Sequence, residues 1–323
     1  MIYILLALAL VFDFLNGMND SSNIVAGVIS SRALRPRTAL VIAAMANFVG
    51  PYLFGVAVAT TVGEDLLDIK AIDLNVVLSA LAAAIVWNVL TWYIGLPSSS
   101  SHALIGGLLG AAIMGSGLEV VRLGGLLKIV LTLLISPLLG MIVGFIIIRI
   151  ILWLFRKATP KVNILFRRMQ VLTLIGLGLS HGANDAQKTM GVITLGLVLM
   201  SKIATFKVPL WVITISASSI ALGTAIGGWR LIRTLGGKIF RIRPVHAFSS
   251  QVAGSAVIFG AAIFGGPVST TQVMSSAIVG VGAGHRANMV RWQVLGEMLT
   301  AWLLTIPSTA AISALLFLIL NNL

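Results

Sequence analysis

Long apolar stretches alternate with short polar gaps along most of the chain. Apolar runs of about 20 residues occur, for example, at 38–62, 74–95, 129–148 and 302–320, and each is long enough to cross the hydrocarbon core of a bilayer. These runs lack the alternation of apolar and polar residues that marks the strands of a membrane β-barrel. The pattern therefore predicts an all-α polytopic membrane protein with ten membrane segments.

Composition agrees with a membrane protein and excludes a water-soluble globule. Only 10% of the residues are charged and 58% are hydrophobic, whereas soluble domains carry roughly 25% charged residues. The first twelve residues lack a basic region and a cleavage site, so we interpret them as part of the first helix and not as a signal peptide. The chain has no cysteine, which rules out disulfides and thiolate metal sites.

The net charge of +13 is concentrated in particular gaps, which indicates topology and argues against a nucleic-acid partner. Lys and Arg gather after the first, fifth, seventh and ninth segments, whereas the gap after the second segment is acidic. Because basic loops face the cytoplasm, we expect both termini outside a cell (plasma or inner) membrane. The gap with Lys202 and Lys207 fits less well. The basic gaps contain Arg32, Arg35, Arg37; Arg156, Lys157, Lys161, Arg167, Arg168; Arg230, Arg233, Lys238, Arg241, Arg243; and Arg286, Arg291.

Three sequence pairs recur in the same order in the two halves. "GMND" (17–20) matches "GAND" (182–185), "TVGEDLLDIK" (61–70) matches "TLGGKIFRIR" (234–243), and "GLPSSSSH" (95–102) matches "GGPVSTTQ" (265–272). We predict a first repeat over 1–155, a short basic cytoplasmic linker over 156–170 and a second repeat over 171–323. With about five segments each, an odd number, the second repeat enters the membrane inverted. Inverted repeats with broken or re-entrant helices meeting near the midplane are typical of secondary transporters.

The first kind of polar cluster places an Asn-Asp pair inside an apolar segment. Asn19-Asp20 and Asn184-Asp185 each follow a glycine, a combination that weakens a helix, so we predict a break at each place. A buried carboxylate needs a cation or a hydrogen-bond donor. Asp20 and Asp185 are therefore candidate ligands for Na⁺, or for a proton.

The second kind of polar cluster has the chemistry of a helix start. Pro97 and Pro267 precede runs of Ser and Thr and then a Gly-containing apolar helix. A helix N-terminus offers unpaired N–H groups and a positive dipole end, which together form an anion site without basic residues. Two such ends could meet around one tetrahedral oxyanion. The candidate residues are Ser99, Ser100, Ser101, Ser269, Thr270 and Thr271.

Several residues beside these clusters allow two interpretations. Asp13, Asn16 and Asn23 lie in the first segment with Asp20, and we count all three as candidate cation-coupling residues, although a structural role for Asp13 is equally consistent. His181 either satisfies a structural hydrogen bond or contacts the ion or anion. Lys188 either forms a salt bridge with Asp185, three residues before it, or balances substrate charge. His102 and Gln272 support the Ser/Thr clusters, and Glu297 is either a structural partner or a coupling carboxylate.

These motifs resemble the inorganic phosphate transporter (PiT) family, in its short bacterial or archaeal form. The doubled Gly-x-Asn-Asp element is similar to that family's signature, and "HGANDAQKTMG", "GLPSSSSH", "GWRLIRTLG" and "GGPVSTTQ" extend the likeness over nearly the whole chain. Met18 departs from the usual alanine. The resemblance implies phosphate uptake coupled to Na⁺ or H⁺, a homodimer and no further cofactor. It also implies that Asn19, Asn184 and the Ser/Thr residues contact the anion.

Three alternatives remain beside alternating-access phosphate import. Members with similar motifs carry sulfate, so the anion could be sulfate. The "SSSSH" run could serve an intramembrane serine hydrolase, although the second copy lacks the histidine and no Gly-x-Ser-x-Gly elbow is present. A channel would show unsaturable flux without ion coupling.

Overall fold

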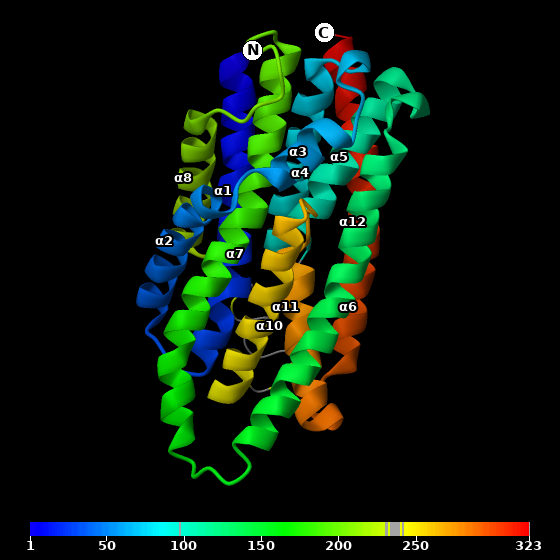
Figure 1. Ribbon diagram of the computed structural model, residues 1–323. Helices are drawn as coiled ribbons and strands as arrows, with labels where there is room; N and C mark the ends of the chain where they lie inside the picture. Colours follow the sequence, from blue (N-terminus) through cyan, green and yellow to red (C-terminus); the bar gives the residue numbers. More distant parts are fainter. Residues whose placement is uncertain (97, 230–231, 233–239, 241, 323) are drawn as a thin grey trace.

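The computed structural model is a bundle of long helices (Figure 1). It describes residues 1–96, 98–229, 232, 240 and 242–322. Pro97, four of the predicted cytoplasmic cations (Arg230, Arg233, Lys238 and Arg241) and most of "TLGGKIFRIR" thus lie outside the described residues. The helices are α1 (Ile2–Ser30), α2 (Pro36–Phe54), α3 (Ala57–Thr60), α4 (Leu74–Ile94), α5 (Ser100–Ser116), α6 (Leu123–Leu154), α7 (Val162–Leu199), α8 (Leu210–Ile226), α10 (Pro244–Ile263), α11 (Thr270–Arg286) and α12 (Trp292–Asn321), with short helical turns at Thr61–Asp65, Ile69–Ala71, Leu118–Val120 and Ala287–Met289.

Seven described helices are long and apolar enough to cross a membrane: α1, α2, α4, α6, α7, α10 and α12. Three more helices, α5, α8 and α11, have 17 residues each, and of these α5 and α8 are apolar. At 1.5 Å per residue they are about 26 Å long, slightly less than the hydrocarbon core. In the described part of the chain, seven of the ten predicted segments are thus long and apolar enough to span a membrane, and the other three coincide with these shorter helices.

Local sequence explains the abrupt change from α4 to α5. Gly95 ends α4 in the left-handed conformation, with φ 79° and ψ 24°, a region that glycine enters at little cost. The Ser99 hydroxyl then caps α5 by accepting a hydrogen bond from the His102 amide. The Ser269 hydroxyl caps α11 in the same way, from the Gln272 amide. The two Ser/Thr clusters thus begin helices as the sequence predicts.

The helices of the two halves have matching packing partners. α5 packs on α12, as α11 packs on α6, and α1 packs on α8, as α2 packs on α7. α6 and α12 also carry an internal proline, Pro137 and Pro307, at corresponding positions. Each of these contacts between the halves therefore has a counterpart in which the two halves exchange roles.

The predicted breaks at the Asn-Asp motifs are wrong. α1 runs without interruption through Gly17–Asp20, and α7 through Gly182–Asp185. The glycines allow close helix packing instead. A Cβ on Gly17 would lie 2.1 Å from the Ile220 carbonyl oxygen of α8, and one on Gly182 would lie 2.2 Å from the Asn47 carbonyl oxygen of α2. Small residues at helix crossings are the usual means of tight packing in membranes.

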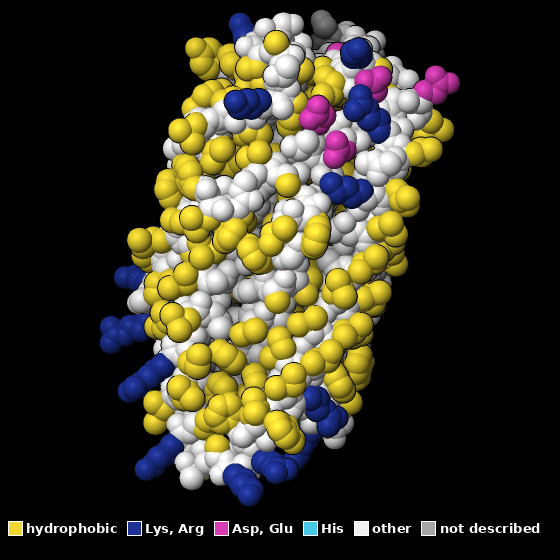
Figure 2. All heavy atoms as spheres, viewed as in Figure 1, with side chains coloured by type: hydrophobic (Ala, Val, Ile, Leu, Met, Phe, Trp, Pro, Cys, Tyr) yellow, Lys and Arg dark blue, Asp and Glu magenta, His cyan; other side chains and the backbone are white. Residues whose placement is uncertain are grey.

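The surface is apolar where a bilayer would contact it. Hydrophobic side chains cover most of the face seen in Figure 2, Lys and Arg lie toward both of its ends, and the acidic side chains lie only toward the upper end. Large apolar residues such as Leu134, Leu138 and Leu303 are more than half exposed. Asp20, Asp185 and Lys188 are by contrast buried. This distribution places the polar chemistry inside the protein and the apolar side chains toward lipid.

Candidate substrate and cation site

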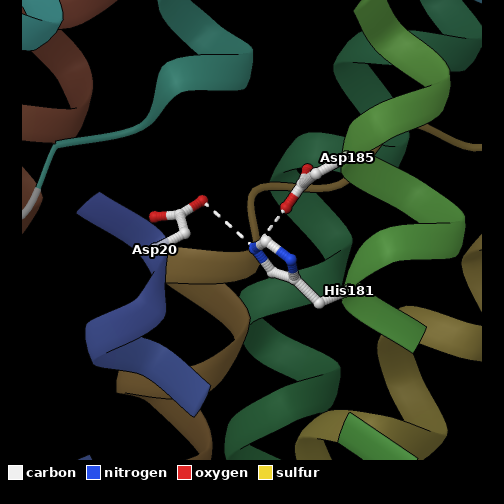
Figure 3. A group of neighbouring side chains, drawn as sticks. All are labelled: Asp20, His181 and Asp185. Atoms are coloured by element: carbon white, nitrogen blue, oxygen red, sulfur yellow. Dashed lines mark ion pairs between the residues drawn. The ribbon is translucent and has the colours of Figure 1, made fainter. Parts of the chain in front are cut away.

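The polar clusters of the two halves meet inside the bundle. α1 contributes Asp20, α7 contributes His181 and Asp185, and the first turn of α11 contributes Thr270 and Thr271. Figure 3 shows Asp20 and Asp185 pointing toward His181 from opposite sides. Asp20 and Asp185 thus lie close together, each on a continuous helix.

Asp20, His181 and Asp185 form a buried triangle of possible cation ligands. His181 Nε2 lies 2.9 Å from Asp185 Oδ2 and 3.6 Å from Asp20 Oδ2, with all three side chains at most 6% exposed. One ligand atom from each residue falls within 4.8 Å of the others. Two carboxylate oxygens and an imidazole nitrogen can bind a metal ion or share a proton.

The hydroxyl of Thr270 joins the two carboxylates. Thr270 Oγ1 lies 2.9 Å from Asp20 Oδ2 and 2.8 Å from Asp185 Oδ2. A hydroxyl carries one hydrogen and can donate to only one carboxylate at a time. The second contact needs a proton on the carboxylate or a cation nearby. The first turn of α11 therefore sits where the charge of the site must be balanced.

The hydrogen bonds behind His181 fix which ring nitrogen carries hydrogen. His181 Nδ1 lies 3.2 Å from Asn47 Oδ1, and Asn47 Nδ2 donates to Thr224 Oγ1 at 2.8 Å. Because the amide oxygen of Asn47 faces the ring, we assign the hydrogen to Nδ1. Nε2 then faces the two carboxylates and requires a proton or a bound cation of its own. The backing residues Asn47 and Thr224 were not predicted as site residues.

Asp20 is held on its other side by residues from both halves. Thr271 Oγ1 donates to Asp20 Oδ1 at 2.7 Å, and Asn23 Nδ2 donates to the same oxygen at 2.9 Å. Asn23 Nδ2 also lies 3.0 Å from Thr271 Oγ1. Asn23 Oδ1 is buried without a hydrogen-bond partner. The predicted candidate Asn23 therefore belongs to the immediate surroundings of Asp20.

Lys188 makes the predicted salt bridge with Asp185, but its surroundings are more extensive. Its ammonium contacts Asp185 Oδ1 closely, and it donates to Ser101 Oγ at 2.6 Å and to the Val268 carbonyl oxygen at 2.7 Å. The side chain is 2% exposed. An ammonium has three hydrogens, and these three oxygens account for all of them.

Asn184 and Ser101 fasten the extended segment before α11. Asn184 Nδ2 donates to the Gly266 carbonyl at 3.1 Å, and its Oδ1 accepts from the Val268 amide at 3.2 Å. Ser101 Oγ donates to the Val268 carbonyl at 2.9 Å. Because Asn184 is fully buried and uses both ends of its amide on backbone, the structure places it as a support for Thr270 and Thr271.

A small polar pocket lies on the Asp20 side of the cluster. Its free volume is about 10 Å³, roughly what one water molecule needs, so phosphate requires a wider opening than this conformation has. Four predicted residues, Asn19, Asp20, Ser100 and Thr271, lie in its wall. The complete lining is Asn19, Asp20, Ser22, Asn88, Thr91, Leu96, Ser98, Ser100 and Thr271.

The remaining candidates lie at different distances from this centre. Ser100 donates to Asn16 Oδ1 at 2.6 Å, and Gln272 Nε2 lies 3.5 Å from His102 Nε2, so the starts of α5 and α11 touch. Asp13 is fully buried, neither of its carboxylate oxygens has a hydrogen-bond partner, and it lies within electrostatic reach of Asp185, His181 and Lys188. Glu297 is exposed, unlike the buried cluster.

Comparison with known proteins places the chain in a family. A model described as "Phosphate transporter family" matches residues 16–313. The chain belongs to this family. It is 44% identical over 317 residues to a protein of Bacillus subtilis (strain 168) named "Probable low-affinity inorganic phosphate transporter", covering 97% of this chain and 95% of that one. A protein of the same name from Rhizobium meliloti (strain 1021) is 42% identical and covers 97% and 94%.

The fold has a solved counterpart. A structure titled "The sodium-dependent phosphate transporter" superimposes with a TM-score of 0.90 at 24% identity, covering all of this chain and 99% of the other. This phosphate transporter family member is accordingly an integral membrane protein and not an enzyme, and the resemblance seen in the motifs is confirmed.

Two polar residues of the pocket, Asn88 and Thr91, were missed by the sequence analysis. Both lie on α4, within the apolar stretch 74–95. An Asn inside a membrane segment is itself a signal of a buried polar role. That signal could have been used, because Asn88 and Thr91 stand three residues apart and thus on one side of the helix.

Proposed function

We propose that the chain is a secondary active transporter that imports inorganic phosphate together with Na⁺ or H⁺ by alternating access. The observation that carries the proposal is the meeting of Asp20 and Asp185 with the first turn of α11 at Thr270, deep inside an apolar bundle. A pair of carboxylates attracts a cation, and the positive end of a helix attracts an anion. Both kinds of site thus lie side by side, as coupled transport requires.

In the proposed transport cycle, two inverted repeats move relative to each other. They comprise residues 1–155 and 171–323, and the linker 156–170 joins them. The matching packing partners of helices in the two halves support this arrangement. Rocking of one repeat against the other around a fixed central site is the usual mechanism of such transporters. The linker and both termini lie at opposite ends of the bundle (Figure 1), which agrees with a cytoplasmic linker and external termini.

The anion, in this proposal, binds in a widened form of the pocket lined by Asn19, Ser100 and Thr271. Ser99 and Ser269 act through the helix caps, which orient the free N–H groups of α5 and α11. Asn184, Ser101 and Thr270 act as supports, because their polar atoms already bind backbone, Lys188 or carboxylates. Tetrahedral anions bind at such helix N-termini without basic residues.

The coupling cation binds between Asp20 Oδ2 and Asp185 Oδ2. Either a proton or a Na⁺ there satisfies both carboxylates, the Thr270 hydroxyl and His181 Nε2. Asn23 and Asn16 hold Asp20 and Ser100 in place, and the buried Asp13 lies within electrostatic reach of Asp185. Cation binding lowers the net negative charge of the centre and thereby favours entry of phosphate.

Proteoliposome uptake of labelled phosphate tests this function. We expect saturable accumulation driven by an imposed Na⁺ or pH gradient, with excess sulfate competing weakly. Accumulation of sulfate in place of phosphate would identify a sulfate carrier. Flux that rises linearly with concentration and ignores both gradients would identify a channel and refute coupled transport.

We also propose that the transporter is a homodimer in the cell membrane. Mass determination of the protein in detergent or native nanodiscs tests this: a mass of two chains is expected, and a single chain of 34.0 kDa would contradict it.

A further inference from the structure

The surroundings of Asp20 and Asp185 are built alike, with one difference. On the first side, Asn23 Nδ2 bonds Asp20 Oδ1 and Thr271 Oγ1. On the second side, Lys188 Nζ bonds Asp185 Oδ1 and Ser101 Oγ. Asn23 and Lys188 occupy the same position after the Asp of each repeated motif, and Thr271 and Ser101 the same position in each Ser/Thr cluster. The two halves thus form equivalent pockets, one holding a neutral amide and the other an ammonium.

The partners of Lys188 are those of a metal cation. One carboxylate oxygen, one hydroxyl oxygen and one backbone carbonyl oxygen surround Nζ. Hard monovalent and divalent cations in proteins prefer these oxygens, and backbone carbonyls beside interrupted helices hold Na⁺ in other transporters. The Val268 carbonyl comes from the extended segment just before α11, and a regular helix would not offer it to a side chain. The ammonium therefore lies in a cage of oxygens suited to a cation.

Lys188 is not free to bind phosphate in this arrangement. Its three hydrogens point to three protein oxygens, and its side chain is 2% exposed. Lys188 contacts only Oδ1 of Asp185. The other oxygen, Oδ2, faces Thr270 and His181. The charge of Lys188 thus acts on Asp185 and not on the pocket lined by Asn19, Ser100 and Thr271.

We propose that the ammonium of Lys188 is a tethered cation that permanently fills the Asp185 side of the site, so that Na⁺ cannot bind there. This assignment rests on the proposed cation-coupled transport and specifies where its exchangeable ion can bind. The exchangeable cation is confined to the space between Asp20 and Asp185 Oδ2. Lys188 is a specificity-determining residue, because it reduces the number of metal ions that the site can take.

The test replaces Lys188 by the residue of the equivalent pocket. Lys188→Asn removes the ammonium and leaves Asp185 Oδ1, Ser101 Oγ and the Val268 carbonyl facing an opening, with a new amide oxygen beside them. Purified protein is titrated with NaCl against choline chloride at constant ionic strength, and both the melting temperature and equilibrium binding of ²²Na⁺ are measured. Relative to wild type, Lys188→Asn is expected to bind an additional Na⁺ per chain, with affinity at that site raised by about tenfold or more because Asp185 loses its partner.

Two further variants locate the added ion. Asp185→Asn combined with Lys188→Asn removes both charges and is expected to lose the additional Na⁺. Lys128→Asn is the matched control, since Lys128 also contacts a threonine hydroxyl, that of Thr61 at 2.8 Å, but is 42% exposed; its Na⁺ response is expected to equal that of wild type. A Lys188→Asn protein that is unstable in choline and stabilised by Na⁺ supports the proposal.

Three results would overturn it. The first is a Lys188→Asn protein whose stability and Na⁺ binding equal those of wild type, or which is equally unstable in both salts. The second is an additional Na⁺ that persists in the double variant. The third is wild-type protein that already binds two Na⁺. These binding measurements need no transport, so absence of phosphate uptake by wild type would refute the proposed function alone.

Discussion

At the scale of single residues, the site depends on one hydroxyl shared by two carboxylates. Thr270 Oγ1 reaches Asp20 from the first half and Asp185 from the second. It is 1% exposed, so water does not replace it readily. Thr270 thus joins the two charges that the proposed transport uses.

Thr270→Val preserves shape and removes this hydroxyl. We expect phosphate uptake to fall by about 10- to 100-fold, because hydrogen bonds to charged groups contribute roughly 1.5–3 kcal/mol, while Thr270→Ser retains most of the activity. Thr300→Val is the control, since Thr300 is exposed and bonds only its own helix at Gly296. Equal uptake by Thr270→Val and wild type would show that the shared hydroxyl is dispensable.

Asp20→Asn and Asp185→Asn differ in their expected effects on stability. Both should abolish ion-driven uptake, because each removes half of the charge that binds the cation. Only Asp185→Asn leaves a buried ammonium without its carboxylate, which costs about 3–5 kcal/mol, so only this variant should melt markedly earlier. Phosphate uptake and thermal melting are measured for both variants, with Asp65→Asn as the control because its side chain is 41% exposed. Normal uptake by either variant would refute the proposed cation site.

At the scale of helices, two glycines determine how closely α1 and α7 approach their neighbours. The Cβ positions of Gly17 and Gly182 fall on backbone oxygens of α8 and α2, and backbone cannot move aside as a flexible side chain can. Both glycines stand just before the Asn-Asp pairs. Close packing therefore fixes the depth and rotation at which Asp20 and Asp185 are presented.

Gly17→Ala and Gly182→Ala should each destabilise the protein by about 1–3 kcal/mol or more, as overpacking does, and should lower uptake by displacing the carboxylates. Gly296→Ala has no atom within 4 Å of the new Cβ and, in the interior of α12, should be neutral or slightly stabilising. Thermal melting of the three variants in detergent distinguishes them. Similar melting temperatures for Gly17→Ala and Gly296→Ala would contradict the packing role.

The sequence predicted helix starts better than it predicted helix continuity. Capping by Ser99 and Ser269 depends on residues within one turn, so the local pattern was sufficient. The continuity of α1 and α7 through Gly17 and Gly182 could not be foreseen, because it depends on helices far along the chain that occupy the space beside each glycine. The Lys188 salt bridge was likewise local, whereas its contacts with Ser101 and Val268 join different parts of the fold.

At the scale of the whole molecule, the positions of the termini and of the charged side chains indicate the same orientation in the membrane. Both termini lie at one end of the bundle, and the connection between α6 and α7 lies at the other (Figure 1). On the face seen in Figure 2, acidic and basic side chains lie together near the first end, whereas the charged side chains near the second end are all basic. Basic loops remain in the cytoplasm, which favours the topology expected from the gaps between apolar runs.

Cysteine labelling can test this orientation directly, because the chain has no cysteine of its own. Glu119→Cys and Lys157→Cys each place one thiol at an exposed position, at the α5–α6 and α6–α7 connections. A membrane-impermeant maleimide added to intact cells should label Glu119→Cys and should label Lys157→Cys only after permeabilisation. The reverse pattern would invert the topology and with it the direction of the proposed transport.

The hydrogen bonds between side chains of the two halves have a consequence for biosynthesis. Asp20 accepts two of its hydrogen bonds from Thr270 and Thr271, yet the ribosome makes these threonines some 250 residues later. During translation the first half therefore enters the membrane with a carboxylate whose protein donors are mostly absent, and such a charge is costly in lipid. Until α11 arrives, the nascent chain must keep Asp20 in contact with water or protonated, and only completion of the polypeptide seals it inside.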